Sequence, residues 1–269
     1  LFGDLDISSI RGLPPGRRPI TTRVVSSEDR GEVYDDIAAR IAEGEQAYIV
    51  VPAIDPSEGA QVGVGPTGPA RDLRTVMREV QEKWLAGKRI AALHGQLSRD
   101  TREQVMERFR LKQIDVLVAT TVIEVGVDVP NATVMVVEQA DRFGLAQLHQ
   151  LRGRVGRGAK DSACYLLADP TTPEAQQRLT VMETVNDGFI LAEKDLEIRG
   201  PGEVFGSRQS GLPPFKVADL MRDRELLAMA KRDAAAWIAQ SPFLGREHEK
   251  TLLRRLVKAY GEQLGLGDV

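Results

Sequence analysis

Short apolar segments alternate with amphipathic stretches through residues 20–172. The apolar segments are rich in Val, Ile and Leu, and they lie at residues 20–25, 46–53, 89–93, 115–119, 133–137 and 163–167. Between them, apolar residues recur at helical spacing, as at Val33, Ile37 and Ile41, and Ser98 is a suitable N-cap for a helix that ends near Phe109. Apolar strands separated by helices are typical of a mostly parallel sheet covered on both faces. The pattern therefore predicts an α/β fold.

The pattern changes on either side of this region. Beyond residue 172 it predicts helices almost throughout, interrupted by a glycine-rich stretch at residues 200–211. Before residue 20, LFGDLDISSI predicts a strand without a partner, and LPPGRRP predicts an extended linker because its prolines oppose helix. We expect the end of an upstream domain and a linker over residues 1–19, an α/β domain over 20–172 and a helical region over 173–269. Because the chain opens on Leu1 rather than Met, we expect it to be a fragment.

Composition narrows the classes of protein to consider. Of the 269 residues, 42% are hydrophobic and 28% are charged, which is typical of a globular domain and argues against disorder. A single cysteine, Cys164, excludes an internal disulfide and suits a reducing compartment, and three histidines leave little for a metal centre. No apolar run is long enough to cross a membrane. The net charge of −3 does not exclude nucleic acid, because a local basic patch is sufficient for binding.

Polar residues follow the buried strand predicted at residues 115–119. Thr120 and Thr121 come directly after it, and ligands in an open α/β sheet bind beyond the carboxyl ends of the strands. Hydroxyl and backbone N–H groups at such a place can hold a phosphate. Further along, Gly126 would allow a close backbone approach and Asp128 would offer a carboxylate to a sugar hydroxyl. The alternative, in which Asp128 only caps a turn, stays open on this segment alone.

The segment QLHQLRGRVGRG at residues 147–158 is basic. Residues 142–160 contain five Lys or Arg residues and no acidic residue. Leucines at helical spacing predict a helix that anchors an arginine-rich loop: Leu145, Leu148 and Leu151. Within this segment, arginines alternate with glycines: Arg152, Arg154 and Arg157. A guanidinium suits phosphate, and on a transferring γ-phosphate it contributes about 10³–10⁵ in rate. The alternative is a solvated basic turn, or one that contacts only a nucleic-acid backbone.

These two segments resemble the motifs of a known family. ATTVIEVGVDVP and QLHQLRGRVGRG resemble motifs V and VI of superfamily 2 helicases, and the longer LAQLHQLRGRVGRG is similar to the RecG and Mfd families. DGFILAEKDLEIRGPGEVFGSRQSG resembles the translocation motif that both families share. PGEVFGSRQSG and FKVADLMRD resemble RecG, since Mfd-like proteins usually carry alanine at the place of Pro201. The resemblance covers nearly the whole chain and implies a RecA-like three-layer lobe followed by a mainly helical C-terminal region.

The resemblance also implies roles for individual residues. Two arginines of motif VI would be arginine fingers that reach ATP held by another lobe: Arg154 and Arg157. Four residues of motifs V and VI would lie near the nucleotide: Gly126, Asp128, Gln150 and Gly153. Three residues would contact the DNA backbone: Thr120, His94 and Gly95. Three residues of the translocation motif would couple ATP turnover to DNA movement: Arg178, Arg199 and Gln209.

Two motifs that an ATP-driven motor needs are absent from the sequence. A P-loop reads G-x-x-x-x-G-K-[ST], but the only Gly-Lys pair, Gly87-Lys88, is followed by Arg89. No Asp-Glu pair exists for a DExH box. We therefore expect ATP and Mg²⁺ to be held mainly by a missing first lobe, and no metal site within this chain. The isolated chain is predicted to be inactive as an ATP hydrolase.

The resemblance implies the second motor lobe of an ATP-dependent DNA helicase or translocase. Such a motor would remodel branched DNA, such as stalled replication forks and Holliday junctions, in recombination and repair. The expected partners are branched DNA, the first helicase lobe and wedge domain of the same polypeptide, and a single-stranded DNA-binding protein. The expected location is the bacterial cytoplasm, in association with the nucleoid and not with a membrane. The alternatives are an Mfd-type double-strand translocase lobe and a non-catalytic module that binds DNA or protein.

Overall fold

The computed structural model describes residues 18–52, 71–120, 129–199 and 223–260. The chain divides into two compact units, one formed by Ile10–Gly200 and the other by Pro201–Val269 together with Leu1–Ser9. The strand expected at residues 1–10 and the glycine-rich stretch at 200–211 lie outside the described residues.

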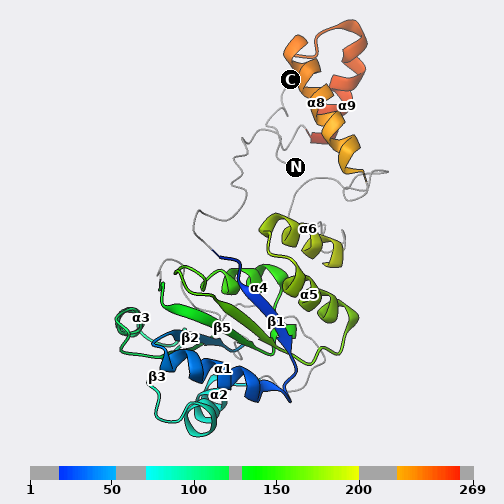
Figure 1. Cartoon of the computed structure of the whole chain (residues 1–269). Helices are drawn as coiled ribbons and strands as arrows, with labels where there is room; N and C mark the ends of the chain where they lie inside the picture. The colour runs from blue at the N-terminus through cyan, green and yellow to red at the C-terminus, as the bar shows by residue number, and fades with distance from the viewer. Residues whose placement is uncertain (1–17, 53–70, 121–128, 200–222, 261–269) are drawn as a thin grey trace. The chain divides into compact units, whose positions relative to one another are not determined.

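A six-stranded, fully parallel sheet forms the centre of the first unit (Figure 1). Its strands are β1 (Thr21–Val25), β2 (Gln46–Val50), β3 (Ile90–Leu93), β4 (Val116–Ala119), β5 (Ala132–Glu138) and β6 (Ala163–Leu167). They lie in the order β1-β6-β5-β2-β4-β3. The four strands β2, β4, β5 and β6 consist entirely of buried residues, which explains why their sequences are mainly apolar and do not alternate between apolar and polar residues.

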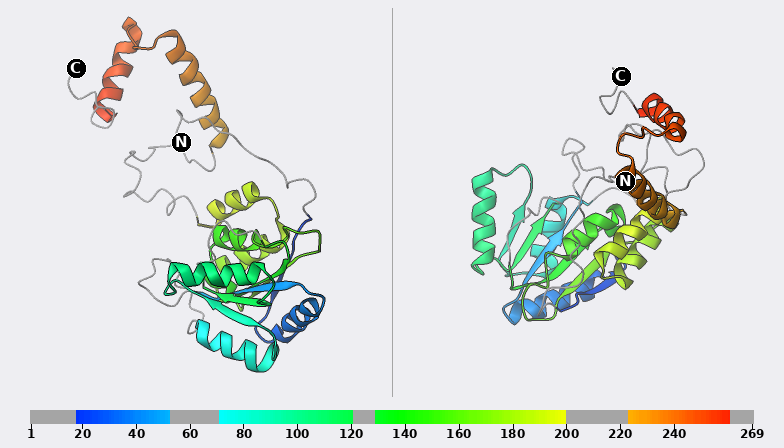
Figure 2. Two further views of the ribbon diagram at one scale, coloured as in Figure 1. Left: turned by 90° about the vertical axis from the view of Figure 1, so that its left-hand side faces the viewer. Right: turned by 90° about the horizontal axis from the view of Figure 1, so that it is seen from above.

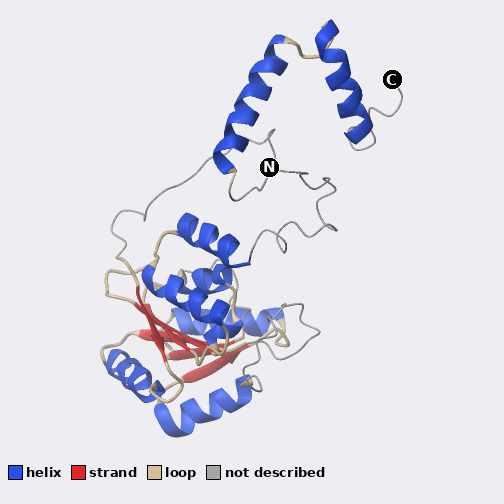
Figure 3. Cartoon of the chain, turned by 90° about the vertical axis from the view of Figure 1, so that its right-hand side faces the viewer, coloured by secondary structure: helices blue, strands red, loops and turns tan. Residues whose placement is uncertain are grey.

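Helices cover both faces of the sheet, as the alternating pattern predicts (Figure 3). On one face lie α1 (Arg30–Ala42) and α2 (Leu73–Glu79), which continues as the π-helical turn η2 (Val80–Trp84). On the other face lie α3 (Arg99–Arg110) and α4 (Leu145–Arg152). Ile37 and Ile41 pack into the hydrophobic core between α1, α2 and the sheet. Leu145 and Leu148 pack into the core on the opposite face of the sheet. Ser98 caps α3, because its hydroxyl accepts a hydrogen bond from the Thr101 N–H at 3.2 Å.

Two helices beyond residue 172 belong to the same unit as the sheet. They are α5 (Pro173–Thr184) and α6 (Gly188–Arg199), which lie beside α4 (Figure 2). Thr172 caps α5, since its hydroxyl accepts from the Ala175 N–H at 3.2 Å, and Pro173 occupies the first helical position. Leu179 and Leu191 join the core that α4 buries. The helical pair is therefore packed on the lobe rather than separate from it.

The second unit contains two long helices and a buried carboxylate. The helices are α8 (Arg224–Gln240) and α9 (Lys250–Tyr260), with a short 3₁₀ turn, η4 (Glu247–Glu249), before α9. Glu249 is fully buried and accepts hydrogen bonds from Trp237 Nε1 at 2.6 Å, Ser241 Oγ at 2.7 Å and the Arg246 N–H at 2.9 Å. Burial alone would raise the pKa of Glu249, but these hydrogen bonds and the charge of Arg246 lower that pKa to about 2.

Candidate functional site

The arginine-rich loop begins where α4 ends. Leu145, Leu148 and Leu151 of α4 are buried against the sheet, so the helix is held firmly, and Gly153 terminates it. Gln150 is exposed on the outer side of α4. Beyond the helix, Arg154 is half-buried and Arg157 is exposed, with Arg157 Nε donating to the Gly153 carbonyl at 3.3 Å. A helix that is fixed on the core thus presents both predicted fingers from its C-terminal end.

Two glycines pack this loop tightly against the rest of the lobe. Gly156 has a φ of +73°, and a Cβ at this position would lie 2.8 Å from Ile20 Cγ1. A Cβ at Gly158 would lie 2.4 Å from the carbonyl oxygen of Pro130. Only glycine fits at either position, and the two close contacts flank Arg157. Pro130 is the last residue of the predicted motif V segment ATTVIEVGVDVP, so the loop lies against the end of that segment.

Arg152 differs from the two arginines that follow it. The sequence places Arg152 in the same basic segment as Arg154 and Arg157, although only the latter two are predicted as arginine fingers. Its side chain is buried, and Nη1 donates to the carbonyls of Met182 at 2.9 Å and Val185 at 3.0 Å. Burial lowers the pKa of the Arg152 guanidinium. Arg152 therefore joins the C-terminal end of α4 to the C-terminal end of α5.

A second contact reinforces this junction. Arg152 Nη2 lies 3.2 Å from His149 Nδ1, and a Cβ added at Gly188, the first residue of α6, would lie 2.9 Å from His149 Nε2. On α5, Arg178 Nη2 donates to the carbonyl of Asp141 at 2.9 Å, in the turn that precedes α4. The helical pair α5–α6 thus contacts both the beginning and the end of the segment that carries the arginines.

The residues predicted to contact DNA lie at the carboxyl edge of the sheet, where the parallel strands end. Thr120 follows β4, and His94 and Gly95 follow β3, which pairs with β4 so that Leu93 is opposite Ala119. The Thr120 N–H donates to the Leu93 carbonyl at 3.1 Å. Thr120 Oγ1 is buried and has no hydrogen-bond partner among the described residues. The structure therefore brings Thr120 and His94 together at the carboxyl edge, whereas the arginine loop lies near the amino ends of β5 and β6.

Several predicted site residues cannot be placed. Gly126, Asp128 and Gln209 lie outside the described residues. Arg199 is the last residue of α6, and its side chain is not described. Within the described ranges, no group of three or more His, Cys, Asp or Glu side chains could hold a metal ion. No helix in these ranges is long and apolar enough to span a membrane.

Sequence reasoning missed the packing role of Arg152 and the ion pair between Lys160 and the buried Glu45. A signal for Arg152 was present, because it lies four residues after Leu148 and seven after Leu145, on the apolar side of α4. For Glu45 there was no comparable signal. Its partners Thr133 and Lys160 lie far away in the sequence and approach it only when the parallel strands pair.

Comparisons with known proteins cover both units. The model of the helicase conserved C-terminal domain matches residues 33–159, and that of the C-terminal part of domain 3 of the ATP-dependent DNA helicase RecG matches residues 185–262. The chain is 46% identical over 268 residues to the ATP-dependent DNA helicase RecG of Synechocystis sp., covering 98% of this chain and 31% of that protein. It is 44% identical over 255 residues to the ATP-dependent DNA helicase RecG of Bacillus subtilis, covering 94% and 36%.

A solved structure agrees with the sequence matches. A structure of RecG bound to a three-way DNA junction is 42% identical, with a TM-score of 0.62, over 84% of this chain and 28% of that chain. The chain spans about a third of the length of the curated relatives it matches. The expected RecA-like lobe with a helical C-terminal region is thus confirmed, and the chain belongs to the RecG family, whose C-terminal motor region it represents.

Proposed function

We propose that this chain is the second motor lobe of an ATP-dependent helicase that remodels branched DNA, such as stalled replication forks and Holliday junctions, in recombination and repair. The observation that carries the proposal is the packed loop after α4, where Gly156 and Gly158 hold the exposed Arg157 beside Pro130. An exposed guanidinium carried by a fixed backbone at the end of an anchored helix suits a γ-phosphate presented by a facing lobe. The branched substrate is inferred from the RecG relative that is bound to a three-way junction.

In this proposal Arg154 and Arg157 are the arginine fingers, and Gln150, Gly153, Gly126 and Asp128 line the same nucleotide from this side. The P-loop lobe holds ATP and Mg²⁺, because this sequence has neither a P-loop nor a DExH box. The fingers stabilise charge that develops on the transferring phosphoryl group, so they act mainly in the transition state. Thr120 and the neighbouring His94 and Gly95 supply the DNA-backbone contacts from the carboxyl edge of the sheet.

Coupling between ATP turnover and DNA movement is assigned to the helical pair α5–α6 and the segment that follows it. Arg178 contacts the turn before α4, and Arg152 joins the end of α4 to the end of α5. A displacement of α4 on ATP hydrolysis would therefore be passed directly to the pair. Arg199, at the end of α6, and Gln209, in the segment beyond it, would pass the displacement to the DNA duplex. No observation on this chain favours the Mfd-type or non-catalytic alternatives over this function.

The coupling assignment is tested by measuring two activities on one preparation of the full-length motor. Arg199→Ala and Gln209→Ala should leave most of the DNA-stimulated ATPase activity while abolishing unwinding of a synthetic fork, because the motor still hydrolyses ATP but no longer moves the DNA. Arg110→Ala, at an exposed position on α3 paired with Glu107, is the matched control and should leave both activities unchanged. If ATPase and unwinding fall in parallel, or if neither falls, the coupling role is wrong.

A further inference from the structure

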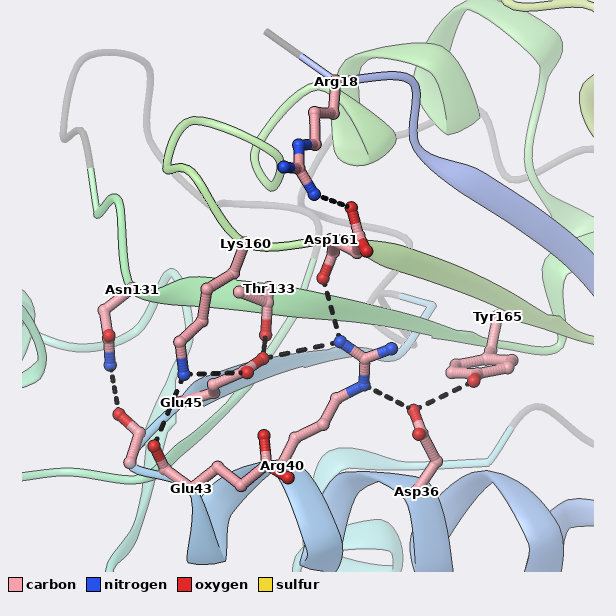
Figure 4. A network of polar contacts seen from close by, with 11 residues as sticks. Arg18, Asp36, Arg40, Glu43, Glu45, Asn131, Thr133, Lys160, Asp161 and Tyr165 are labelled. Carbon is pink, nitrogen blue, oxygen red and sulfur yellow. Dashed lines mark hydrogen bonds and ion pairs between the residues drawn. The ribbon is translucent and has the colours of Figure 1, made fainter. Parts of the chain in front are cut away.

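A buried carboxylate holds the chain just downstream of the arginine loop. Glu45 immediately precedes β2 and is 5% exposed. Its Oε1 atom pairs with Lys160 Nζ at 2.9 Å, and the same ammonium lies 3.4 Å from the Glu43 carbonyl (Figure 4). Lys160 is three residues beyond Arg157. The loop that carries the predicted finger is thus tied at its downstream end to the amino edge of the sheet.

The charge on Glu45 is well compensated. Its Oε2 atom accepts a hydrogen bond from the hydroxyl of Thr133, on β5, and lies 3.4 Å from Arg40 Nη1, on α1. Burial alone would raise the pKa of Glu45, but the hydrogen bonds from Thr133 and Lys160 and the nearby positive charges lower it. A buried carboxylate that is satisfied on both oxygens forms a rigid anchor, whereas an unpaired one would be strongly destabilising.

The residues after Lys160 are held by the same network. Arg40 Nη1 donates to the Asp161 carbonyl at 2.9 Å, and Arg18 Nη1 pairs with Asp161 Oδ1 at 2.6 Å (Figure 4). The Ser162 carbonyl accepts from the Thr21 N–H at 3.0 Å. Upstream, Gly156 and Gly158 are fixed by their close contacts. The backbone around Arg157 is therefore held on both sides. Close contacts of the glycines hold it within the loop, and the contacts of Glu45, Arg40 and Arg18 with residues 160 and 161 hold it downstream.

We infer that Glu45 is a positioning residue for Arg157, and that it acts through Lys160 and the backbone of residues 158–162. This inference rests on the proposed function of Arg157 as an arginine finger. Glu45 lies within the amino edge of the sheet and contacts no substrate in this assignment. Glu45 affects the position of the Arg157 side chain, and misplacing a catalytic group by about 1 Å costs about 10²-fold in rate.

The first test compares two variants of the full-length motor, each at a paired carboxylate that directly precedes a strand of the sheet. Glu45→Gln removes the charge that holds Lys160 but keeps the side-chain size. Asp115→Asn is the matched control, because Asp115 is also a largely buried carboxylate directly before a strand, and it accepts from the Arg89 N–H at 2.8 Å and Arg89 Nε at 3.1 Å, before β3 and not in the loop. We expect Glu45→Gln to lower kcat of DNA-stimulated ATP hydrolysis by about 10- to 100-fold with the KM for ATP little changed. Asp115→Asn should lower Tm and leave kcat within about twofold of the unsubstituted motor.

The second test removes the partner of Glu45. The side chain of Lys160 is 48% exposed, so Lys160→Met is compatible with folding even if Glu45→Gln is not. Lys160→Met should reproduce the loss of kcat, and the double variant should be no worse than either single variant, because both remove the same contact. Additive losses, or a Tm loss with kcat unchanged in Lys160→Met, would overturn the positioning role. Arg157→Ala in the same assay separates the two claims: if it leaves kcat intact, the finger assignment itself fails.

Discussion

At the scale of single residues, three arginines within six positions have different environments. Burying a guanidinium requires acceptors, and Arg152 finds them in the carbonyls of Met182 and Val185, where α5 ends and its carbonyls lack intrahelical partners. Arg157 remains exposed at a position set by the flanking glycines. Composition alone predicts the basic character of the loop. It does not separate the packing arginine from the solvent-facing one, since that depends on helix phase and on where α5 lies.

The close contact of Gly158 leads to a prediction about stability. Gly158→Ala places a Cβ where the Pro130 carbonyl oxygen lies, at 2.4 Å, so the loop or the segment before β5 must shift. We expect the free energy of unfolding to fall by about 1–3 kcal/mol, measured by urea denaturation. Gly31→Ala is the control, because its Cβ would meet only the Trp84 ring at 3.5 Å, and it should be neutral or slightly stabilising. Equal stability of the two variants would show that the loop is not packed against Pro130.

At the scale of elements, apolar periodicity predicts most of the lobe. The strand expected at residues 163–167 matches β6, and the other strand and helix boundaries lie close to those expected. The π-helical turn η2 could not be predicted, because it depends on packing: Trp84 at its end stacks on Tyr34 of α1 with ring centroids 5.3 Å apart. The docking of α5 and α6 on α4 was not predicted either, because it combines apolar packing of Leu179 and Leu191 with the hydrogen bonds of Arg152 to the end of α5, and the position of α5 is set only by the fold.

The second unit contains a buried carboxylate, Glu249, whose protonation is expected to change its stability in acid. The folded-state pKa of Glu249 is about 2, below the unfolded value of about 4.3, so Glu249 stabilises the α8–α9 unit above that unfolded value. This contribution should be lost as the pH falls from about 4.3 through about 2. The Trp237 indole N–H resonance should titrate over this window in NMR spectra, because Nε1 donates to Glu249 at 2.6 Å. Glu249→Gln should abolish the titration and Glu247→Gln, at an exposed position, should not. A Trp237 resonance that does not respond to acid would contradict the hydrogen bond.

At the scale of the whole lobe, function depends on strand order. Pairing of β3 with β4 brings His94 beside Thr120 at the carboxyl edge, and the adjacency of β5 and β6 brings Pro130 beside Gly158 at the other edge. The order β1-β6-β5-β2-β4-β3 also pairs β1 with β6 and β2 with β5, which are distant in sequence, so local patterns cannot predict the whole order. The motif resemblance predicted the residues of both candidate sites, and only the fold shows that these sites occupy opposite edges of one sheet.

The central claim is that this lobe completes an ATP site with Arg157. The most direct test is the steady-state rate of DNA-stimulated ATP hydrolysis by the full-length motor and its Arg157→Ala variant, with the isolated chain, which is predicted to be inactive, measured alongside. A finger that engages the γ-phosphate predicts that kcat falls by about 10³-fold or more, with the KM for ATP and Tm nearly unchanged. A kcat within a few-fold of the unsubstituted motor, together with a lower Tm, would show that Arg157 is structural and would contradict the account.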